Sequence, residues 1–212
     1  MHAVTKGTDV DTALALTIAE RGWAYARHFL DDAVWRVLAE ELHAGQEGGA
    51  LRRAGIGARE RYRVEEAIRG DYIRWLDQAC LSEAQSRALS RLEGLRLACN
   101  RDLQLGLLDF EGHFAVYPEN SYYRRHRDQP LDSDSRVLSC VVYLNQSWRP
   151  EDGGQLRLHL DTQDQPGRVD ILPEGGALVC FLSARFFHEV LPARRERLSL
   201  TGWFRRRPST DR

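Results

Sequence analysis

The chain has 212 residues, of which 42% are hydrophobic and 29% charged, as in an ordinary globular protein. A formal net charge of −1 excludes a protein that holds nucleic acid or membranes through its overall charge. The N-terminus lacks the pattern of a secretory signal, and no run is long enough to span a membrane, so we expect a cytoplasmic protein. Lys6 is the only lysine, an arginine bias that a GC-rich bacterial genome explains.

The first part of the chain predicts helices with one strand between them. Residues 1–20 have a weakly helical pattern, and the alternation in residues 22–30 predicts a strand. A helix is expected from Asp31, because acidic residues fill its first turn and apolar residues follow at helical spacing, and Gly45 can end it.

A long loop and a second helix come next. Residues 46–70 are rich in Gly, Arg and Glu and weak in periodicity, which predicts a loop with at most one short strand pair. Residues 82–103 predict a helix, with Ser82 as its N-cap and one apolar stripe along it.

From about residue 104, short apolar or alternating runs recur between Gly, Pro, Asp and Asn. Seven of these runs predict strands, over residues 110–118, 136–145, 153–160, 168–173, 176–182, 186–192 and 197–205. This succession indicates a mainly β fold, a sandwich or jelly roll braced by the earlier helices. We expect one domain over residues 1–212, with a helical and strand-containing part over about 1–104 and the jelly-roll core over about 105–207.

The cysteines do not indicate a metal or disulfide framework. None of the four belongs to a Cys-x-x-Cys pair. Cys140 and Cys180 lie inside apolar runs, which is typical of reduced, buried thiols.

The segment YYRRHRDQP, residues 122–130, sets an imidazole and a carboxylate two residues apart. On a strand, His126 and Asp128 would point to one face, as two ligands of a metal do. So short a motif occurs often by chance, and a solvated His and Asp is the simpler interpretation unless a third ligand exists. An iron site of two histidines and one carboxylate needs a second histidine, for which His159 and His188 are the downstream candidates.

The last expected strand carries an arginine on its polar face. Arg197, Ser199, Thr201 and Trp203 share this face, and leucines fill the opposite one, which belongs against a core. The polar face therefore points into the barrel, where a charge is costly without a counter-charge, and no acid stands beside the arginine on that face. A bound carboxylate would supply the partner, since a guanidinium can bind it with two hydrogen bonds.

Together these motifs resemble the Fe(II)/2-oxoglutarate-dependent dioxygenases. The similarity is closest to the prolyl 4-hydroxylases that modify hypoxia-inducible factor and to their bacterial counterparts, and it runs from about residue 22 to residue 204. Its sharpest segments are RGDYIRWLD (69–77), YPENSYYRRHRDQP (117–130), RVLSCVVYLN (136–145), DGGQLRL (152–158) and HEVLPARRERLSLTGWF (188–204). The resemblance implies a double-stranded β-helix (jelly-roll) core.

The resemblance also implies a role for each matching residue. The Fe(II) ligands would be His126, Asp128 and His188. Arg197 would pair with the far carboxylate of 2-oxoglutarate, with a hydrogen bond from Tyr143. The cosubstrate pocket would also be lined by Tyr117, Leu156, Thr201 and Trp203.

A substrate loop near residues 46–70 is implied as well. Asp71 and Arg136 stand where the family has an acid–arginine pair that braces this loop, and Trp75 would pack nearby. For Trp75, Trp203 and Leu156, a plain place in the core is at least as good an interpretation. The loop has its own sequence, so it does not identify the target.

The implied activity is hydroxylation of a prolyl residue in a protein, which consumes O2 and 2-oxoglutarate and produces succinate and carbon dioxide. Ascorbate is expected to stimulate the reaction. The implied bacterial target is elongation factor Tu. One alternative is an oxygenase of the same fold for a small molecule or a free amino acid, and another is a non-catalytic jelly-roll binding or sensor protein. Nucleic-acid dealkylation is disfavoured, because LSLTGWF, without a second arginine, follows Arg197.

Overall fold

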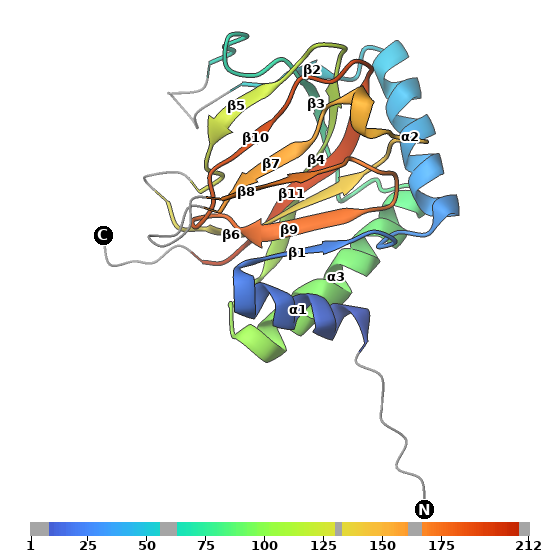
Figure 1. The fold of residues 1–212 in the computed structure, drawn as a ribbon. Coiled ribbons are helices and arrows are strands. Elements are labelled where there is room, and N and C mark those ends of the chain that lie inside the picture. The colour runs from blue at the N-terminus through green and yellow to red at the C-terminus, as the bar shows by residue number, and fades with distance from the viewer. Residues whose placement is uncertain (1–8, 56–62, 130–132, 161–166, 208–212) are drawn as a thin grey trace, which may run out of the picture.

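The computed structural model describes residues 9–55, 63–129, 133–160 and 167–207. Within these residues two antiparallel sheets face each other, and helices cover the outer side of the larger sheet (Figure 1). The helices are α1 (Val10–Arg21), α2 (Asp32–Glu47) and α3 (Glu83–Leu103). This is the predicted mainly β fold with flanking helices, and the two facing sheets form the jelly roll.

The larger sheet holds seven strands and the smaller sheet four. The order in the larger sheet is β1 (Trp23–Ala26), β9 (Leu178–Leu182), β6 (Arg136–Tyr143), β11 (Arg197–Arg205), β4 (Asp109–Tyr117), β3 (Tyr72–Trp75) and β2 (Arg52–Arg53). The order in the smaller sheet is β5 (Tyr123–His126), β10 (His188–Val190), β7 (Leu156–His159) and β8 (Arg168–Ile171). All seven strands predicted after residue 104 are present.

Helices α1 and α3 begin after side chains that cap them, whereas Asp31 before α2 makes no capping hydrogen bond. Ser82 accepts a hydrogen bond from the backbone N–H of Gln85 at 3.1 Å, as its predicted role requires. Helix α2 runs two residues past the predicted end at Gly45. The predicted strand over residues 22–30 ends at Ala26, because the N–H groups of Phe29 and Leu30 turn to the carbonyl of Gly176.

The region predicted as a long loop is partly regular. Strand β2 lies within this region and pairs with β3, which begins just after it at Tyr72 and was not predicted as a strand. Strand β5 was not predicted either, because its sequence YRRH has no apolar alternation. Residues 56–62 of this region lie outside the described residues, as do residues 1–8, 130–132, 161–166 and 208–212.

Two separate cores pack against the larger sheet. The outer core joins the three helices to outward side chains of the sheet, such as Leu200 and Cys180. The inner core fills the space between the sheets and includes Tyr143, Phe181 and Leu158. The cysteines are unpaired, three of them buried and Cys80 exposed. No helix among the described residues is long and apolar enough to cross a bilayer.

Candidate active site

Two histidines and one carboxylate meet at the edge of the inner core. His126 ends β5, Asp128 lies in the turn two residues later, and His188 begins β10, directly opposite His126 in the sheet. One ligand atom from each lies within 4.8 Å of the others. The Nε2 atoms of His126 and His188 stand 3.6 Å and 3.5 Å from the two carboxylate oxygens of Asp128. The three side chains therefore surround a space between them.

A hydrogen bond of His126 aims its Nε2 at this space, whereas His188 Nδ1 is buried with no hydrogen-bond partner among the described residues. His126 Nδ1 lies 2.7 Å from the carbonyl oxygen of Arg124, to which it donates, so Nε2 keeps its lone pair for a metal. The other candidate, His159, lies outside the cluster, with Nε2 at 3.1 Å from the carboxylate of Glu189. The structure thus brings His188, and not His159, to the pair in residues 126–128.

The charges of the cluster suit a divalent metal. Burial and the neighbouring His126 lower the pKa of His188 to about 4, so its imidazole is neutral at neutral pH. Burial acts to raise the pKa of Asp128, but the histidines and a 2.7 Å hydrogen bond from Ser139 outweigh it and hold that pKa well below its usual range. Two imidazoles and one carboxylate with open positions are the donor set that non-haem Fe(II) takes.

Arg197 is buried without a carboxylate partner. Its side chain is 1% exposed, and none of the ion pairs among the described residues includes it. Its Nε donates to the carbonyl of Gly154 at 3.0 Å, and its guanidinium carbon lies 5.0 Å and 5.1 Å from the ring centroids of Tyr117 and Tyr143. An uncompensated buried charge is costly, so this site calls for an anion.

Two neighbours of Arg197 shape the space around it, Tyr143 with its hydroxyl and Gly154 by its lack of a side chain. The Tyr143 hydroxyl is buried without a hydrogen bond among the described residues, and burial raises the pKa of Tyr143 to about 12, so it remains a neutral donor. Gly154 has φ of +67°, and a Cβ there would stand 3.3 Å from Arg197 Cδ and 2.9 Å from Ala193 Cβ. A guanidinium and a free hydroxyl together fit a carboxylate of 2-oxoglutarate.

Three of the remaining predicted cosubstrate residues share the inner face of the larger sheet, and the fourth, Leu156, comes from the smaller sheet. Across β11 and β4, Arg197 stands opposite Tyr117 and Thr201 opposite His113, and Trp203 is further along the same face. Leu156 enters the inner core from the smaller sheet. The structure thus gathers these side chains around one interior, and their contact with a cosubstrate remains a prediction.

The predicted ion pair between Asp71 and Arg136 is wrong. Asp71 is bound by Arg69 through two hydrogen bonds of 2.7 Å and 2.5 Å, because Arg69 stands two residues away on the same extended segment. Arg136 pairs with Glu111 at 3.0 Å, and its guanidinium carbon lies 3.5 Å from the ring centroid of Trp203.

Trp75, which was expected to pack near this pair, is not a plain core residue. Its ring lies 4.9 Å from that of His113 and 6.4 Å from that of Trp203, while 37% of the residue stays exposed. The ring nitrogens His113 Nδ1 and Trp203 Nε1 are buried without hydrogen-bond partners among the described residues.

Sequence reasoning missed several residues that support the cluster. Ser139 orients Asp128, and its signal was a polar residue inside the apolar run RVLSCVVYLN. Tyr123 stacks on His126 with ring centroids 3.6 Å apart, and Arg69 binds Asp71. A spacing of three predicts opposite faces on a strand, which hid the contact of Tyr123, whereas the two-residue spacing of Arg69 and Asp71 was a signal for their pair.

The chain is similar to proteins of known class. The family model described as the 2OG-Fe(II) oxygenase superfamily matches residues 112–205. The human prolyl hydroxylase EGLN3 is 32% identical over 200 residues, which cover 87% of this chain and 79% of that protein. A hypoxia-inducible factor prolyl hydroxylase of Caenorhabditis elegans is 28% identical over 210 residues, which cover 92% of this chain and 28% of that longer protein.

Solved structures show the same likeness. A prolyl-4-hydroxylase of Pseudomonas putida is 46% identical, with a TM-score of 0.84, over 93% of this chain and 100% of that one. A prolyl hydroxylase of Trichoplax adhaerens, solved with a peptide fragment of the oxygen degradation domain of hypoxia-inducible factor, is 26% identical, with a TM-score of 0.81, over 92% and 89% of the two chains.

Proposed function

This chain belongs to the prolyl hydroxylase family of the 2-oxoglutarate- and Fe(II)-dependent oxygenases, and we propose that it hydroxylates a prolyl residue of a protein substrate. The family uses Fe(II), 2-oxoglutarate and O2. The observation that carries the proposal is a buried Arg197, without an ion-pair partner among the described residues, on the same interior that holds the His126, Asp128 and His188 cluster. A non-catalytic binding protein has no need of both features.

In the proposed reaction the side chains hold and orient the reactants. His126, Asp128 and His188 would hold Fe(II), which supplies, with O2, the oxidising chemistry that side chains lack. Arg197 and Tyr143 would bind the far carboxylate of 2-oxoglutarate and so fix the direction in which its other end points. The overall reaction converts 2-oxoglutarate, O2 and the prolyl residue into succinate, carbon dioxide and a hydroxyprolyl residue.

Other residues would shape the same interior. Tyr117, Leu156, Thr201 and Trp203 are proposed to line the cosubstrate pocket and exclude water from it. Asp71, Arg136 and Trp75 are proposed to support the region that contacts the substrate. Each would do so through the neighbouring side chains described above. Ascorbate is proposed as the reductant that keeps the metal ferrous.

A protein substrate is supported by the relatives. The Trichoplax adhaerens structure holds a peptide fragment of hypoxia-inducible factor. Elongation factor Tu is the first candidate to test, because the bacterial group that the sequence resembles implies it. Such a substrate also requires a cytoplasmic enzyme, which is part of the proposal.

Mass spectrometry tests this proposal directly. Purified elongation factor Tu, and in parallel a protein extract, would be incubated with the enzyme, Fe(II), ascorbate and 2-oxoglutarate. We expect the gain of one oxygen atom on a proline, dependent on 2-oxoglutarate and absent with the Asp128→Ala variant. Consumption of 2-oxoglutarate stimulated by a free amino acid or another small molecule, with no modified protein, would contradict the proposal and favour the alternative oxygenase.

A further inference from the structure

Strand β5 contains a bulge directly before the first metal-ligand candidate. Along the pair of β5 and β10, His126 stands opposite His188, and Tyr123 stands opposite Val190. Four residues of β5 therefore face three of β10. In a regular strand, residues three apart point to opposite faces, but an extra residue brings them to the same side. The bulge places the ring of Tyr123 beside that of His126.

The two rings are stacked. Their centroids lie 3.6 Å apart, and their planes meet at 18°. The Nδ1 hydrogen bond to Arg124 fixes where one edge of the His126 ring points. A parallel ring at van der Waals distance also fixes the plane of the imidazole, and hence the direction of the Nε2 lone pair. Burial raises the pKa of Tyr123 to about 12, so the stacking partner is a neutral phenol.

The Tyr123 ring is itself held by Arg69. The guanidinium carbon of Arg69 lies 4.3 Å from the centroid of this ring, within the range of a cation–π contact. The side chain of Arg69 is fixed by its two hydrogen bonds to Asp71 and by a third, of 3.2 Å, to the carbonyl of Gly55.

The backbone joins the same two segments. Arg69 forms an antiparallel bridge with Tyr123, the N–H of Gly70 donates to Tyr122, and the N–H of Arg124 donates to Ile68. The segment around Arg69 therefore extends the small sheet next to β5. A chain of contacts runs from Asp71 through Arg69 and Tyr123 to His126.

We propose that Tyr123 and Arg69 are positioning residues for the metal ligand His126. Neither side chain is required to touch the metal or a substrate. Tyr123 sets the plane of the imidazole, and Arg69 keeps the Tyr123 ring in place. The inference rests on the metal assignment within the proposed function and extends it to residues outside the ligand set.

Metal affinity, measured without any protein substrate, tests the inference. The probe is Mn(II), and electron paramagnetic resonance measures the concentration of the free ion. We expect Tyr123→Leu to weaken Mn(II) binding by about 10-fold or more, the size of effect found for outer partners of metal ligands. Tyr123→Phe keeps the flat ring and is expected to bind Mn(II) like the native chain.

A spectroscopic readout separates positioning from loss of fold. Anaerobic Fe(II) and 2-oxoglutarate form a visible charge-transfer band when both chelate at such a site, and its position depends on ligand geometry. Tyr123→Leu should shift or weaken this band, and Tyr123→Phe should restore it. If the leucine variant does not fold, Tyr123→Met, which fills similar space without a flat ring, carries the same expectation.

Arg69→Lys tests the outer end of the contact chain. Lysine keeps the charge beside Asp71 but lacks the planar guanidinium. We expect a smaller loss of Mn(II) affinity than for Tyr123→Leu, in the same direction. A loss larger than that of Tyr123→Leu would show that Arg69 does not act through the ring.

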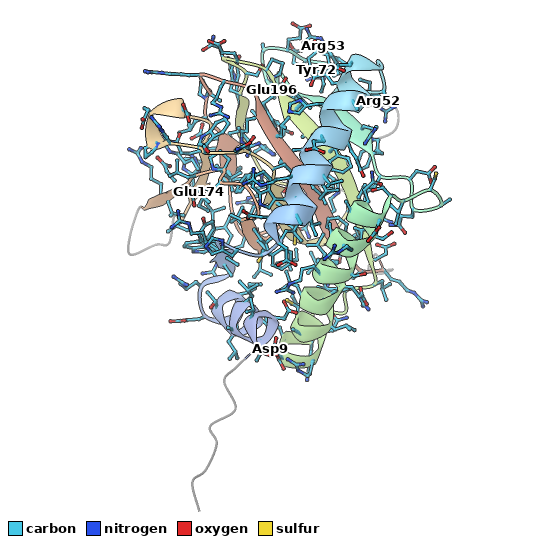
Figure 2. The ribbon with its side chains drawn as sticks, turned by 90° about the vertical axis from the view of Figure 1, so that its right-hand side faces the viewer. Asp9, Arg52, Arg53, Tyr72, Glu174 and Glu196 are labelled. Carbon is cyan, nitrogen blue, oxygen red and sulfur yellow. The ribbon has the colours of Figure 1, made fainter. Side chains whose placement is uncertain are left out.

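The chain offers a matched control in Arg53 and Tyr72, which lie together at the edge formed by β2 and β3 (Figure 2). The guanidinium carbon of Arg53 lies 5.0 Å from the Tyr72 ring centroid, a contact of the same kind. Tyr72 stacks on no metal-ligand candidate, so Tyr72→Leu should leave Mn(II) affinity unchanged.

Native Mn(II) affinity and a native band in a folded Tyr123→Leu protein would overturn the inference. So would an equal loss of affinity in Tyr72→Leu. The absence of prolyl hydroxylation with any substrate would not affect these measurements. A native chain that binds no Mn(II) would instead overturn the metal assignment, and with it the proposed function.

Discussion

The two faces of β11 are buried to a similar degree but differ in chemistry. On the outer face Leu198 and Leu200, at 4% and 1% exposed, pack into the core under the helices. On the inner face Arg197 and Ser199, at 1% and 0%, point into the space between the sheets. Alternation along one strand thus places side chains that stabilise the fold on one face and side chains available to bind a ligand on the other.

The two faces differ in whether their side chains find all their interactions within the protein. The outer leucines gain their full stabilisation from apolar burial in the folded chain itself. Among the described residues, the inner face keeps the Arg197 charge without a carboxylate partner and the Tyr143 hydroxyl without a hydrogen bond. We therefore expect substitutions on the outer face to change the free energy of unfolding, and substitutions on the inner face to change ligand binding.

The largest effect is expected inside, at Asp128. Asp128→Ala removes the only carboxylate of the cluster described in the structure, so metal binding and 2-oxoglutarate consumption should fall below detection. Consumption is measured as succinate formed. His159→Ala, a histidine of the smaller sheet outside the cluster, is the matched control and should stay active. Succinate formation by Asp128→Ala at the native rate would contradict the ligand assignment.

On the outer face, Leu200→Ala is expected to lower the free energy of unfolding by about 3–5 kcal/mol, because it leaves a cavity in the core. Denaturant unfolding measures this, and the protein that remains folded should bind 2-oxoglutarate with native affinity. The control is Leu97→Ala, at a side chain 54% exposed, which should stay within about 0.5 kcal/mol. A loss of cosubstrate affinity without loss of stability in Leu200→Ala would contradict the assignment of the outer face to stability alone.

Back on the inner face, Arg197→Met should weaken 2-oxoglutarate binding by about 2–5 kcal/mol, or roughly 30-fold and upward. The free energy of unfolding should not fall, because the variant removes a buried charge that lacks a carboxylate partner. Calorimetry gives the cosubstrate Kd, and Mn(II) affinity serves as the internal control. Unchanged cosubstrate affinity would show that Arg197 does not bind the carboxylate.

The smallest effect is expected for Tyr143→Phe. The variant removes one hydroxyl that has no hydrogen-bond partner among the described residues, so 2-oxoglutarate binding should weaken by about 0.5–1.5 kcal/mol while the free energy of unfolding stays the same. Tyr25→Phe, whose hydroxyl donates to Glu174 at 3.3 Å, is the control and should leave cosubstrate binding intact. A marked loss of stability in Tyr143→Phe would mean that its hydroxyl is satisfied within the protein.

Sequence reasoning succeeded where local pattern decides structure. The alternation of residues 197–205 gave both faces of β11, and two-residue spacing paired His126 with Asp128. It failed where the resemblance supplied the partner. Asp71 was assigned to Arg136, although two-residue spacing also places Arg69 on the same face of an extended segment as Asp71.

The stack of Tyr123 on His126 could not be predicted from their spacing. A spacing of three predicts opposite faces on a strand, and only the bulge against β10 reverses this. Ser139 could have been found, because a serine inside an apolar strand needs a partner, which is Asp128.

The most direct test of the account is anaerobic titration of the native chain with Fe(II) and 2-oxoglutarate, followed by visible absorption. The account predicts a charge-transfer band that requires both components, and its loss in His188→Ala, which lacks one imidazole of the cluster. A well-folded native chain that gives no band would contradict the assignment of His126, Asp128 and His188 as a metal site beside Arg197.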